Sequence, residues 1–336
     1  MPMMPVSAEA PGDHPNSDPH APARGRDARM PTGIPLRGWQ DVGYRVWTKI
    51  GDENLTLIAA GIAFFVLLAL LPGITALVAL GGIMFLDPER IADQLADVVQ
   101  LMPEDARTIL TDQAQSVANA SSDDLGLLAI FGLGFAIWSA TKGVGSMIGG
   151  LNIVYDEREK RGFLHLTALK IGLTVLLIVG VLIGFVMAAL LPVTLSLLQL
   201  DSLVEIGVSI AGWSLLILFV LIALAVLFRF GPSRRQARWQ WLSIGSVAGA
   251  LVWLVSSIGF AVFVANFGNF NQSFGSLTGV VILLLWLWIS AFVVLLGAAV
   301  NAEIEAQTRI DSTIGEPRPM GERGATKADE LGESFG

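Results

Sequence analysis

The sequence predicts an all-α membrane protein, built as a bundle of six transmembrane helices. Of its 336 residues, 53% are hydrophobic and only 15% are charged, whereas a soluble globular domain carries about 25% charged residues. Six apolar runs are also long enough to cross a bilayer, which takes about 20 helical residues. The distribution of lysine and arginine then gives these runs a consistent orientation. The predicted spans are 55–86, 125–151, 171–200, 206–228, 242–265 and 277–300.

The last apolar run is the strongest of the six. It has no charged residue among the 24 positions from Leu277 to Val300. At about 1.5 Å of rise per residue it is roughly 36 Å long, which exceeds the roughly 30 Å of a hydrocarbon core. Glu303 and Glu305 then return the chain to water. An uncharged polar loop precedes the run and supplies Asn266, Asn271, Gln272 and Ser276.

The first and third spans are predicted to be long, kinked helices. The first run has 32 residues and contains Pro72, and the third has 30 residues and contains Pro192. A proline inside a helix removes one backbone hydrogen bond and bends or breaks the helix. At Pro72 two interpretations stay open, a kinked structural helix or a hinge that forms part of a binding site.

The segments outside the spans are expected to differ in order. Residues 1–36 contain eight of the fifteen prolines, and we expect a disordered tail because they cannot bury enough apolar surface to offset ordering entropy. The acidic, glycine-rich residues 306–336 are expected to be disordered as well, which leaves 37–305 as the six-helix domain. The first outer loop, 87–124, contains two short amphipathic patterns that predict a helical pair. This pair either packs over the membrane domain or forms a lid over a cavity.

Positive charges predict the orientation of the chain, because cytoplasmic loops of membrane proteins are enriched in lysine and arginine. The loops after the first, third and fifth spans contain only Arg90 and Arg107. The loops after the second and fourth spans contain four cations each, so both termini are expected in the cytoplasm. These eight cations are Arg158, Lys160, Arg161, Lys170, Arg229, Arg234, Arg235 and Arg238.

Two pairs of glycines spaced four residues apart predict close helix packing. They are Gly145 with Gly149 in the second span and Gly245 with Gly249 in the fifth. Small residues at this spacing let the backbones of neighbouring helices approach, so a bulky side chain there is expected to push the helices apart.

A basic cluster directly follows the fourth span. Its members are Arg234, Arg235 and Arg238. Basic residues beside a span commonly contact anionic headgroups of the inner leaflet, so lipid contact and control of topology are expected here. Nucleic acid is not expected as a partner.

Lys142 is an ionisable residue inside the second span. One interpretation is a snorkelling lysine, whose ammonium group reaches the membrane interface along its aliphatic stem. The other is a cation that lines a polar cavity, since ionisable groups in spans usually face the protein interior. Its neighbour would then be an anionic headgroup, Asn152 or Tyr155.

The residues do not predict an enzymatic site. The chain has no cysteine, and its three histidines are His14 and His20 in the predicted N-terminal tail and the isolated His165. A metallohydrolase needs three or four converging ligands, and the sequence contains neither an HExxH pattern nor a GxxxxGK[ST] phosphate loop. We therefore expect no metal, no cofactor and no catalysis.

Four motifs carry a resemblance to a known family. They are AAGIAFFVLLALLPGI at 59–74, Leu151-Asn152-x-x-Tyr155, GPSRRQARW at 231–239 and FGSLTGVVILLLWLWISAFVVLLGAAVNAE at 274–303. In this order and spacing, which covers residues 45–305, they resemble the YihY/virulence factor BrkB family of bacterial inner-membrane proteins. The chain has Phe65 and Phe274 where the family has tyrosine, so no role can rest on hydroxyl groups at these positions.

This resemblance implies a six-helix fold in a bacterial inner membrane and, for some relatives, serum resistance or export of lipid-like molecules. We expect a transporter or flippase-like exporter of a lipid-like or anionic amphiphile, with membrane lipids as partners and a homo-oligomer as a compatible state. The alternative is a non-transporting protein that assembles or organises the envelope. Some members carry a ribonuclease label, which no motif in this sequence supports. The candidate substrate-path residues are Lys142, Asn152, Tyr155, Pro72, Asn266, Asn271, Gln272 and Ser276.

Overall fold

The computed structural model describes residues 24–83, 95–96, 104–119, 122–198, 202–267 and 278–334. Apart from one short 3-10 helix, every regular element in these ranges is an α-helix, and no β-strand occurs among them. The prediction of an all-α protein is therefore confirmed for this part of the chain.

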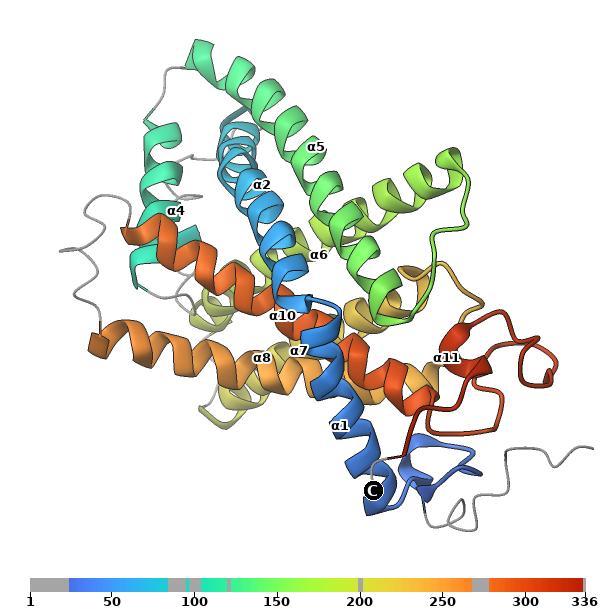
Figure 1. Cartoon of the computed structure of the whole chain (residues 1–336). Coiled ribbons are helices and arrows are strands. Elements are labelled where there is room, and N and C mark those ends of the chain that lie inside the picture. The colour runs from blue at the N-terminus through green and yellow to red at the C-terminus, as the bar shows by residue number, and fades with distance from the viewer. Residues whose placement is uncertain are drawn as a thin grey trace, which may run out of the picture.

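Helix α10, Thr278–Glu305, lies at the centre of the fold (Figure 1). It packs against α8 (Trp239–Phe267), α2 (Leu55–Ile83), α4 (Glu104–Ala118) and α1 (Leu36–Asp52). Within its membrane-length stretch 39% of the residues are buried inside the chain. Its sequence is apolar on all sides, as expected for a helix that other helices surround.

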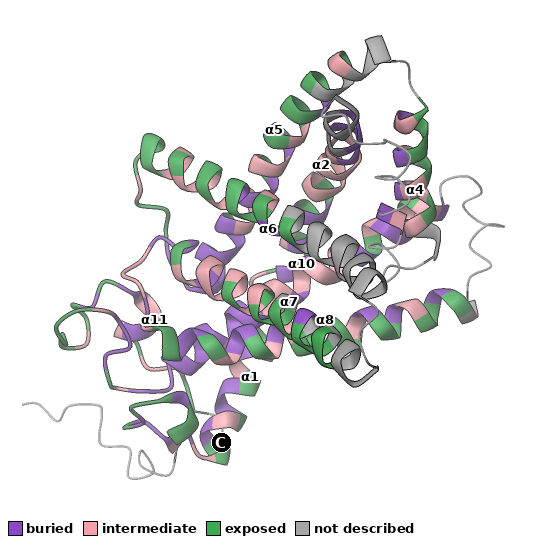
Figure 2. Cartoon of the chain, turned by 180° about the vertical axis from the view of Figure 1, so that it is seen from behind, coloured by how far each residue is buried: buried purple, intermediate pink, exposed green. Residues whose placement is uncertain are grey.

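Helices α6 (Phe163–Leu198) and α7 (Ser202–Phe230) lie at the periphery instead. Only 11% and 6% of their membrane-length stretches are buried inside the chain, and Figure 2 shows exposed and intermediate residues along both. These exposed residues are mostly leucine, isoleucine and valine. Such faces suit hydrocarbon chains, which are as apolar as the side chains themselves.

Among the described residues, five helices are long and apolar enough to cross a membrane. They are α2, α6, α7, α8 and α10. Helix α5 (Ser122–Val154), which contains the predicted second span, has 33 residues and packs along α2. It is not among the five, so the count of six spans stays a prediction.

Helix α2 is continuous from Leu55 to Ile83 with Pro72 inside it, so this proline does not break the helix. One missing hydrogen bond is evidently tolerated where the neighbouring helix supports the backbone. A Cβ atom on Gly132 of α5 would lie only 3.1 Å from the Pro72 carbonyl oxygen, which shows how closely α5 approaches. A kink at this position stays a prediction.

Of the predicted helical pair in the outer loop, one member is described. It is α4, and it packs on α2 and α10 through buried residues such as Leu110 and Ala114. The Gln113 amide nitrogen also donates a hydrogen bond to the Thr75 hydroxyl, at 2.9 Å. This arrangement matches the interpretation in which the helix packs over the membrane domain. Apart from residues 95–96, the first member of the pair lies outside the described residues.

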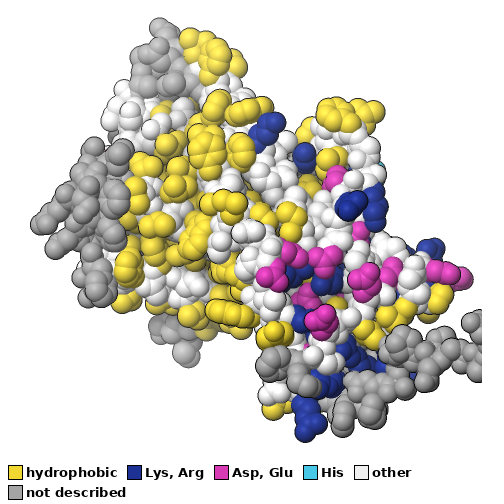
Figure 3. All heavy atoms as spheres, viewed as in Figure 1, with side chains coloured by type: hydrophobic (Ala, Val, Ile, Leu, Met, Phe, Trp, Pro, Cys, Tyr) yellow, Lys and Arg dark blue, Asp and Glu magenta, His cyan; other side chains and the backbone are white. Residues whose placement is uncertain are grey.

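The expectation of a disordered C-terminal tail is wrong for residues 306–334. They fold back on the chain and include the short helix α11, Thr326–Asp329. Residues 24–35, also expected to be disordered, pack beside them (Figure 1). We call residues 24–54, 155–162, 231–238 and 301–334 the polar cap. Figure 3 shows the charged side chains gathered at this end and hydrophobic side chains over most of the rest of that face.

Hydrogen bonds between distant segments explain this order. The Thr308 hydroxyl donates to the Ala28 carbonyl oxygen at 2.7 Å, and Arg26 Nη2 donates to the Gly332 carbonyl oxygen at 2.7 Å. The Gly332 N–H donates in turn to the Ala306 carbonyl oxygen at 2.8 Å. The prediction of disorder rests only on the small apolar surface that these segments can bury. In the structure, hydrogen bonds between their polar groups hold them in place.

The two glycine pairs have different environments. A Cβ atom on Gly245 would collide with the Gly297 carbonyl oxygen and with Asn301, so α8 and α10 do approach through a glycine contact. Asn301 reinforces it, because its Oδ1 accepts a hydrogen bond from the Gly245 N–H at 2.7 Å. Gly249 also faces Gly297. Gly149, by contrast, has no neighbouring atom within 4 Å of such a Cβ, so the predicted packing role is wrong there.

Gly145 is close to another helix, but its neighbour is a side chain. A Cβ atom there would lie 3.2 Å from Cε of Lys170 in α6. This flexible side chain can move aside, so Gly145 does not mark a backbone contact of the kind seen at Gly245.

Candidate functional site

The best-defined polar site lies in the polar cap, where α10 ends. Arg234 and Glu305 form an ion pair in which both side chains are fully buried, with Nη2 2.7 Å from Oε1 and Nη1 2.8 Å from Oε2. The Ser312 hydroxyl donates a third hydrogen bond to the same carboxylate, at 2.9 Å. A two-pronged arrangement is among the strongest ways to pair arginine with a carboxylate. It joins the 231–238 loop, α10 and the C-terminal segment.

Tyr155 lies against this ion pair. The guanidinium carbon of Arg234 is 4.2 Å from the centre of the Tyr155 ring, which is a cation–π contact. The tyrosine side chain is fully buried, and burial raises its pKa well above the usual value. The phenol therefore stays neutral and supports the guanidinium with its ring.

Asn152 ties the end of α5 to the 231–238 loop. Its Oδ1 accepts a hydrogen bond from the Ser233 N–H at 2.7 Å, and its Nδ2 donates to Glu159 at 3.0 Å. The Asn152 and Tyr155 positions of the LNxxY motif thus both face the GPSRR segment. Both residues connect parts of the polar cap.

A second set of ion pairs surrounds the first. Lys327 of α11 lies between two carboxylates, with Nζ 2.6 Å from Glu303 and 2.8 Å from Asp156. Arg45 of α1 pairs with the same Glu303 at 2.7 Å, and Lys49 pairs with Asp156 at 2.9 Å. The network therefore links α1, α10, α11 and the loop after α5.

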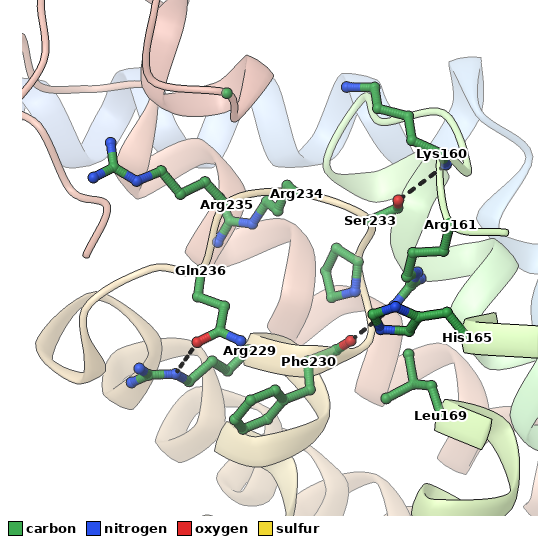
Figure 4. Close-up of a pocket in the computed structure, with 12 residues that line it drawn as sticks. Lys160, Arg161, His165, Leu169, Arg229, Phe230, Ser233, Arg234, Arg235 and Gln236 are labelled. Atoms are coloured by element: carbon green, nitrogen blue, oxygen red, sulfur yellow. Dashed lines mark hydrogen bonds between the residues drawn. The ribbon is translucent and has the colours of Figure 1, made fainter. Parts of the chain in front are cut away.

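A cavity of about 480 Å³ lies beside the buried ion pair, between the start of α6 and the end of α7. This volume falls within the range of sites for small molecules, roughly 300–1,000 Å³. Figure 4 shows Arg161 and His165 on the α6 side, and Arg229 with Gln236 on the α7 side. The cavity is lined by Lys160, Arg161, His165, Leu169, Arg229, Phe230, Pro232, Ser233, Arg234, Arg235, Gln236 and Gly324. Five of these residues are lysine or arginine, and none is acidic.

Three of the five cations are neutralised by carboxylates that lie outside the lining. Arg234 has Glu305, as described above, and Lys160 has Glu157 at 3.0 Å. Arg161 has Glu159 at 2.7 Å, and this hydrogen bond is the main reason why the pKa of Glu159 falls to about 2. Arg161 also donates to the carbonyl oxygens of residues 230 and 231, so it holds the end of α7.

Arg229 and Arg235 are not neutralised in this way. In the described ranges neither arginine has a carboxylate within 4 Å. The Nη1 atom of each is buried and has no hydrogen-bond partner. Arg229 stacks on Trp239, with its guanidinium carbon 4.3 Å from the ring centre. Arg235 donates from Nη2 to the Glu316 carbonyl oxygen at 3.3 Å. The cavity therefore carries an excess of positive charge.

The structure separates the predicted substrate-path residues. It brings Asn152 and Tyr155 together at the Arg234 ion pair, but Pro72 lies inside α2 and does not line the cavity. Lys142 is exposed and does not line the cavity, and its Nζ lies 6.0 Å from the centre of the Trp138 ring, so both interpretations of this lysine stay predictions. The side chains of Asn266, Asn271, Gln272 and Ser276 lie outside the described residues.

The basic cluster also differs from the expectation. Contact with lipid headgroups is wrong for Arg234, because its guanidinium group is completely buried against Glu305. Arg238 donates from Nε to the Thr313 carbonyl oxygen at 3.0 Å, so it too binds the C-terminal segment. A buried partner on a distant helix is what positions the arginine, and such a partner cannot be read from the charge pattern of one loop.

Sequence reasoning missed the roles of Glu305 and Arg229. The sequence predicts only that Glu305 returns the chain to water, although its place one helical turn after Asn301 is a signal that the polar end of α10 is buried. For Arg229 the sequence predicts only a positive charge on the cytoplasmic side. In the described part of the chain, no three His, Asp or Glu side chains are grouped so that they could hold a metal ion.

Comparisons with known proteins identify related membrane proteins. A UPF0761 membrane protein of Aliivibrio fischeri (strain MJ11) is 24% identical over 258 residues, which cover 76% of this chain and 80% of the relative. A UPF0761 membrane protein of Tolumonas auensis is 35% identical over 103 residues, but these cover only 30% of this chain and 34% of the relative. No solved structure matches the chain.

Another relative has a different kind of name. YfkH of Bacillus subtilis (strain 168), which is named a ribonuclease-like protein, is 26% identical over 260 residues that cover 75% of this chain and 90% of YfkH. A sequence model of the family described as Virulence factor BrkB matches residues 46–320, which include every predicted span and residues 46–54, 155–162, 231–238 and 301–320 of the polar cap. The chain is therefore a membrane protein of the virulence factor BrkB family.

Proposed function

We propose that this protein is a transporter or flippase-like exporter of an anionic amphiphile in the bacterial inner membrane. The observation that carries the proposal is the basic cavity, which combines uncompensated cations with the apolar side chains of Leu169 and Phe230. An amphiphile has the matching combination of a charged headgroup and an apolar chain. The cavity lies at the start of α6 and the end of α7. These two helices have the most exposed apolar faces among the candidate spans.

The proposal places the polar cap in the cytoplasm. The basic loops 155–162 and 231–238, with three lysines or arginines each, both belong to the cap, and cytoplasmic loops are enriched in these residues. The cavity would then receive its ligand from the inner leaflet or from the cytoplasm. Export would then carry the ligand from this side of the membrane toward the outer face.

We also propose that the chain is not a ribonuclease. The best-buried carboxylates of the cap already hold cations of the same chain, Glu305 with Arg234 and Glu303 with Arg45 and Lys327. Carboxylates occupied in this way are poorly placed to bind a catalytic metal or to move protons. The name of YfkH describes that relative, and this arrangement gives no support for transferring its activity.

Lipid translocation in proteoliposomes tests the proposal. The purified chain is reconstituted with trace fluorescent lipid, either anionic or zwitterionic, and the inner-leaflet label that becomes accessible to a membrane-impermeant quencher is followed over time. We expect the chain to accelerate movement of the anionic lipid, and the exposed Lys142→Gln variant to match the wild type. If a monodisperse, folded protein moves neither lipid faster than protein-free vesicles, the exporter proposal fails and the non-transporting envelope role takes its place.

A further inference from the structure

We infer that Arg229 and Gln236 form a binding site for a phosphomonoester at the edge of the basic cavity. The inference deepens the proposed function, because an anionic lipid headgroup is one source of such a group. Free phosphate is the other source, and both would use the same donors.

One hydrogen-bond donor of Arg229 is unsatisfied. Nη1 of Arg229 is buried and has no hydrogen-bond partner among the described residues. Buried N–H groups in native proteins are almost always paired, and an unpaired one calls for a bound water or ion as its explanation. Because this donor belongs to a guanidinium group without a carboxylate partner, an anion fits it better than water does.

The guanidinium group of Arg229 is held in a fixed orientation. Its face stacks on Trp239 at 4.3 Å, and its Nε donates to Oε1 of Gln236 at 3.3 Å. These two contacts fix the plane of the group, and neither Nη1 nor Nη2 has a hydrogen-bond partner among the described residues. The Nε2 of Gln236 has no hydrogen-bond partner among the described residues, so it is a further donor beside them. A planar fork with an adjacent amide donor suits the oxygen atoms of a phosphate.

The charge around Arg229 is positive. Arg235 adds a second uncompensated guanidinium group to the cavity lining, although Figure 4 shows its side chain directed away from Arg229. Arg235 therefore raises the positive potential without being a direct ligand. Two uncompensated positive charges match the roughly −1.5 to −2 charge of a phosphomonoester at neutral pH better than the single charge of a diester or a carboxylate.

The position of the site connects it to the membrane. Trp239 is half-exposed at the start of α8, and tryptophan beside a span commonly lies at headgroup depth. A phosphate on Arg229 would lie at this level, with the apolar side chain of Phe230 next to it in the sequence. The geometry thus favours a phosphate that carries an apolar chain, of the phosphatidic acid type.

Calorimetric titration of the purified full-length chain in detergent tests the site. The probes are dihexanoyl phosphatidic acid, dihexanoyl phosphatidylglycerol and inorganic phosphate. We expect Arg229→Gln to weaken binding of dihexanoyl phosphatidic acid by about tenfold or more, since hydrogen bonds to charged groups are worth this much. The matched control is Arg158→Gln, an exposed arginine outside the cavity, which should stay within about twofold of the wild type.

Each outcome has a definite meaning. Equal affinity for inorganic phosphate would identify free phosphate as the ligand, and much weaker phosphate binding would identify the lipid headgroup. No binding by the wild type, tighter binding of the diester, or an equal loss in Arg158→Gln would overturn the site. If Arg229→Gln fails to fold, Arg229→Lys keeps the charge without the fork and should show an intermediate loss. Lipid translocation is measured separately, so binding without translocation would retain the site and remove the exporter.

Discussion

At the scale of single residues, the pair formed by Arg234 and Glu305 makes the sharpest energetic prediction. Removing one member leaves a buried charge without a partner, which typically costs about 3–5 kcal/mol. We expect Arg234→Met or Glu305→Gln to lower the free energy of unfolding by an amount of this order. The double variant Arg234→Met/Glu305→Leu should lose less than the two single losses together, because it leaves no unpaired charge. Chemical unfolding in detergent measures this, and single losses below about 1 kcal/mol would mean that the pair is solvated.

Glu53 gives a prediction about pH. Burial raises the pKa of Glu53 to about 7, while its neighbour Lys49 is shared with Asp156. Burial also acts on Asp156, but hydrogen bonds from Lys327 and Lys49 hold its pKa below the usual value. Between pH 4.5 and about 7 the folded chain binds the Glu53 proton more tightly than the unfolded chain does, so stability should fall as the pH rises through this window.

The role of Glu53 is tested by comparing how steeply thermal stability changes with pH in the wild type and in a variant. Thermal stability of Glu53→Gln, measured in detergent from pH 5 to 8, should depend less on pH than that of the wild type. The variant should also be the more stable of the two at pH 8, where the wild-type carboxylate is charged and half-buried. An unchanged slope would show that Glu53 is ionised throughout, held by Lys49.

Individual residues also show what sequence can and cannot predict about the site. Asn152, Tyr155 and Arg234 were singled out by their motifs, and the structure does bring them together. Glu305, the partner of Arg234, was not predicted, because a pairing across 71 residues depends on how α8 and α10 pack. Local sequence identifies polar residues in unusual places, whereas the contact that satisfies each one is a property of the folded chain.

At the scale of helices, glycine contacts make a matched pair of predictions. Gly245→Ala should strongly destabilise the chain, because the added methyl group would collide with the Gly297 carbonyl oxygen and displace Asn301 from its hydrogen bond. Gly149→Ala should be neutral or slightly stabilising, since the new methyl group meets no atom and alanine favours a helix by about 1 kcal/mol over glycine. Melting temperatures of the two variants in one detergent provide the measurement. Equal destabilisation by both would contradict the packing of α8 on α10.

Helices differed in how well the sequence predicted them. The five membrane-length helices were predictable because long apolar runs have few alternatives in a bilayer. α11 and residues 24–35 were not, because no apolar periodicity marks them and they are held by hydrogen bonds to distant carbonyl groups. The continuity of α2 through Pro72 was also unpredictable, since support from α5 decides whether a proline breaks a helix.

At the scale of the whole molecule, the C-terminal segment is predicted to be part of the fold. A chain truncated after Thr308 loses Ser312 from the Glu305 carboxylate and Lys327 from Glu303 and Asp156. We expect this variant to insert into the membrane but to melt several degrees lower than the wild type. Lys327→Met isolates one part of the effect and should give a smaller loss. A truncated chain with wild-type stability would show that the segment is not packed in solution as the structure describes.

The grouping of the polar cap also predicts which segments share one side of the membrane. The Thr326 N–H donates to Glu157 at 2.7 Å, and the Arg235 N–H donates to the Gly324 carbonyl oxygen at 2.9 Å. A bilayer cannot separate segments in such contact, so reporter fusions at 160, 235 and 320 must all read the same side. From the charge distribution we expect this side to be the cytoplasm, and fusions at 100 and 270 should read periplasmic. A different reading among the first three fusions would refute the polar cap itself, whereas a periplasmic reading of all three would reverse only the orientation.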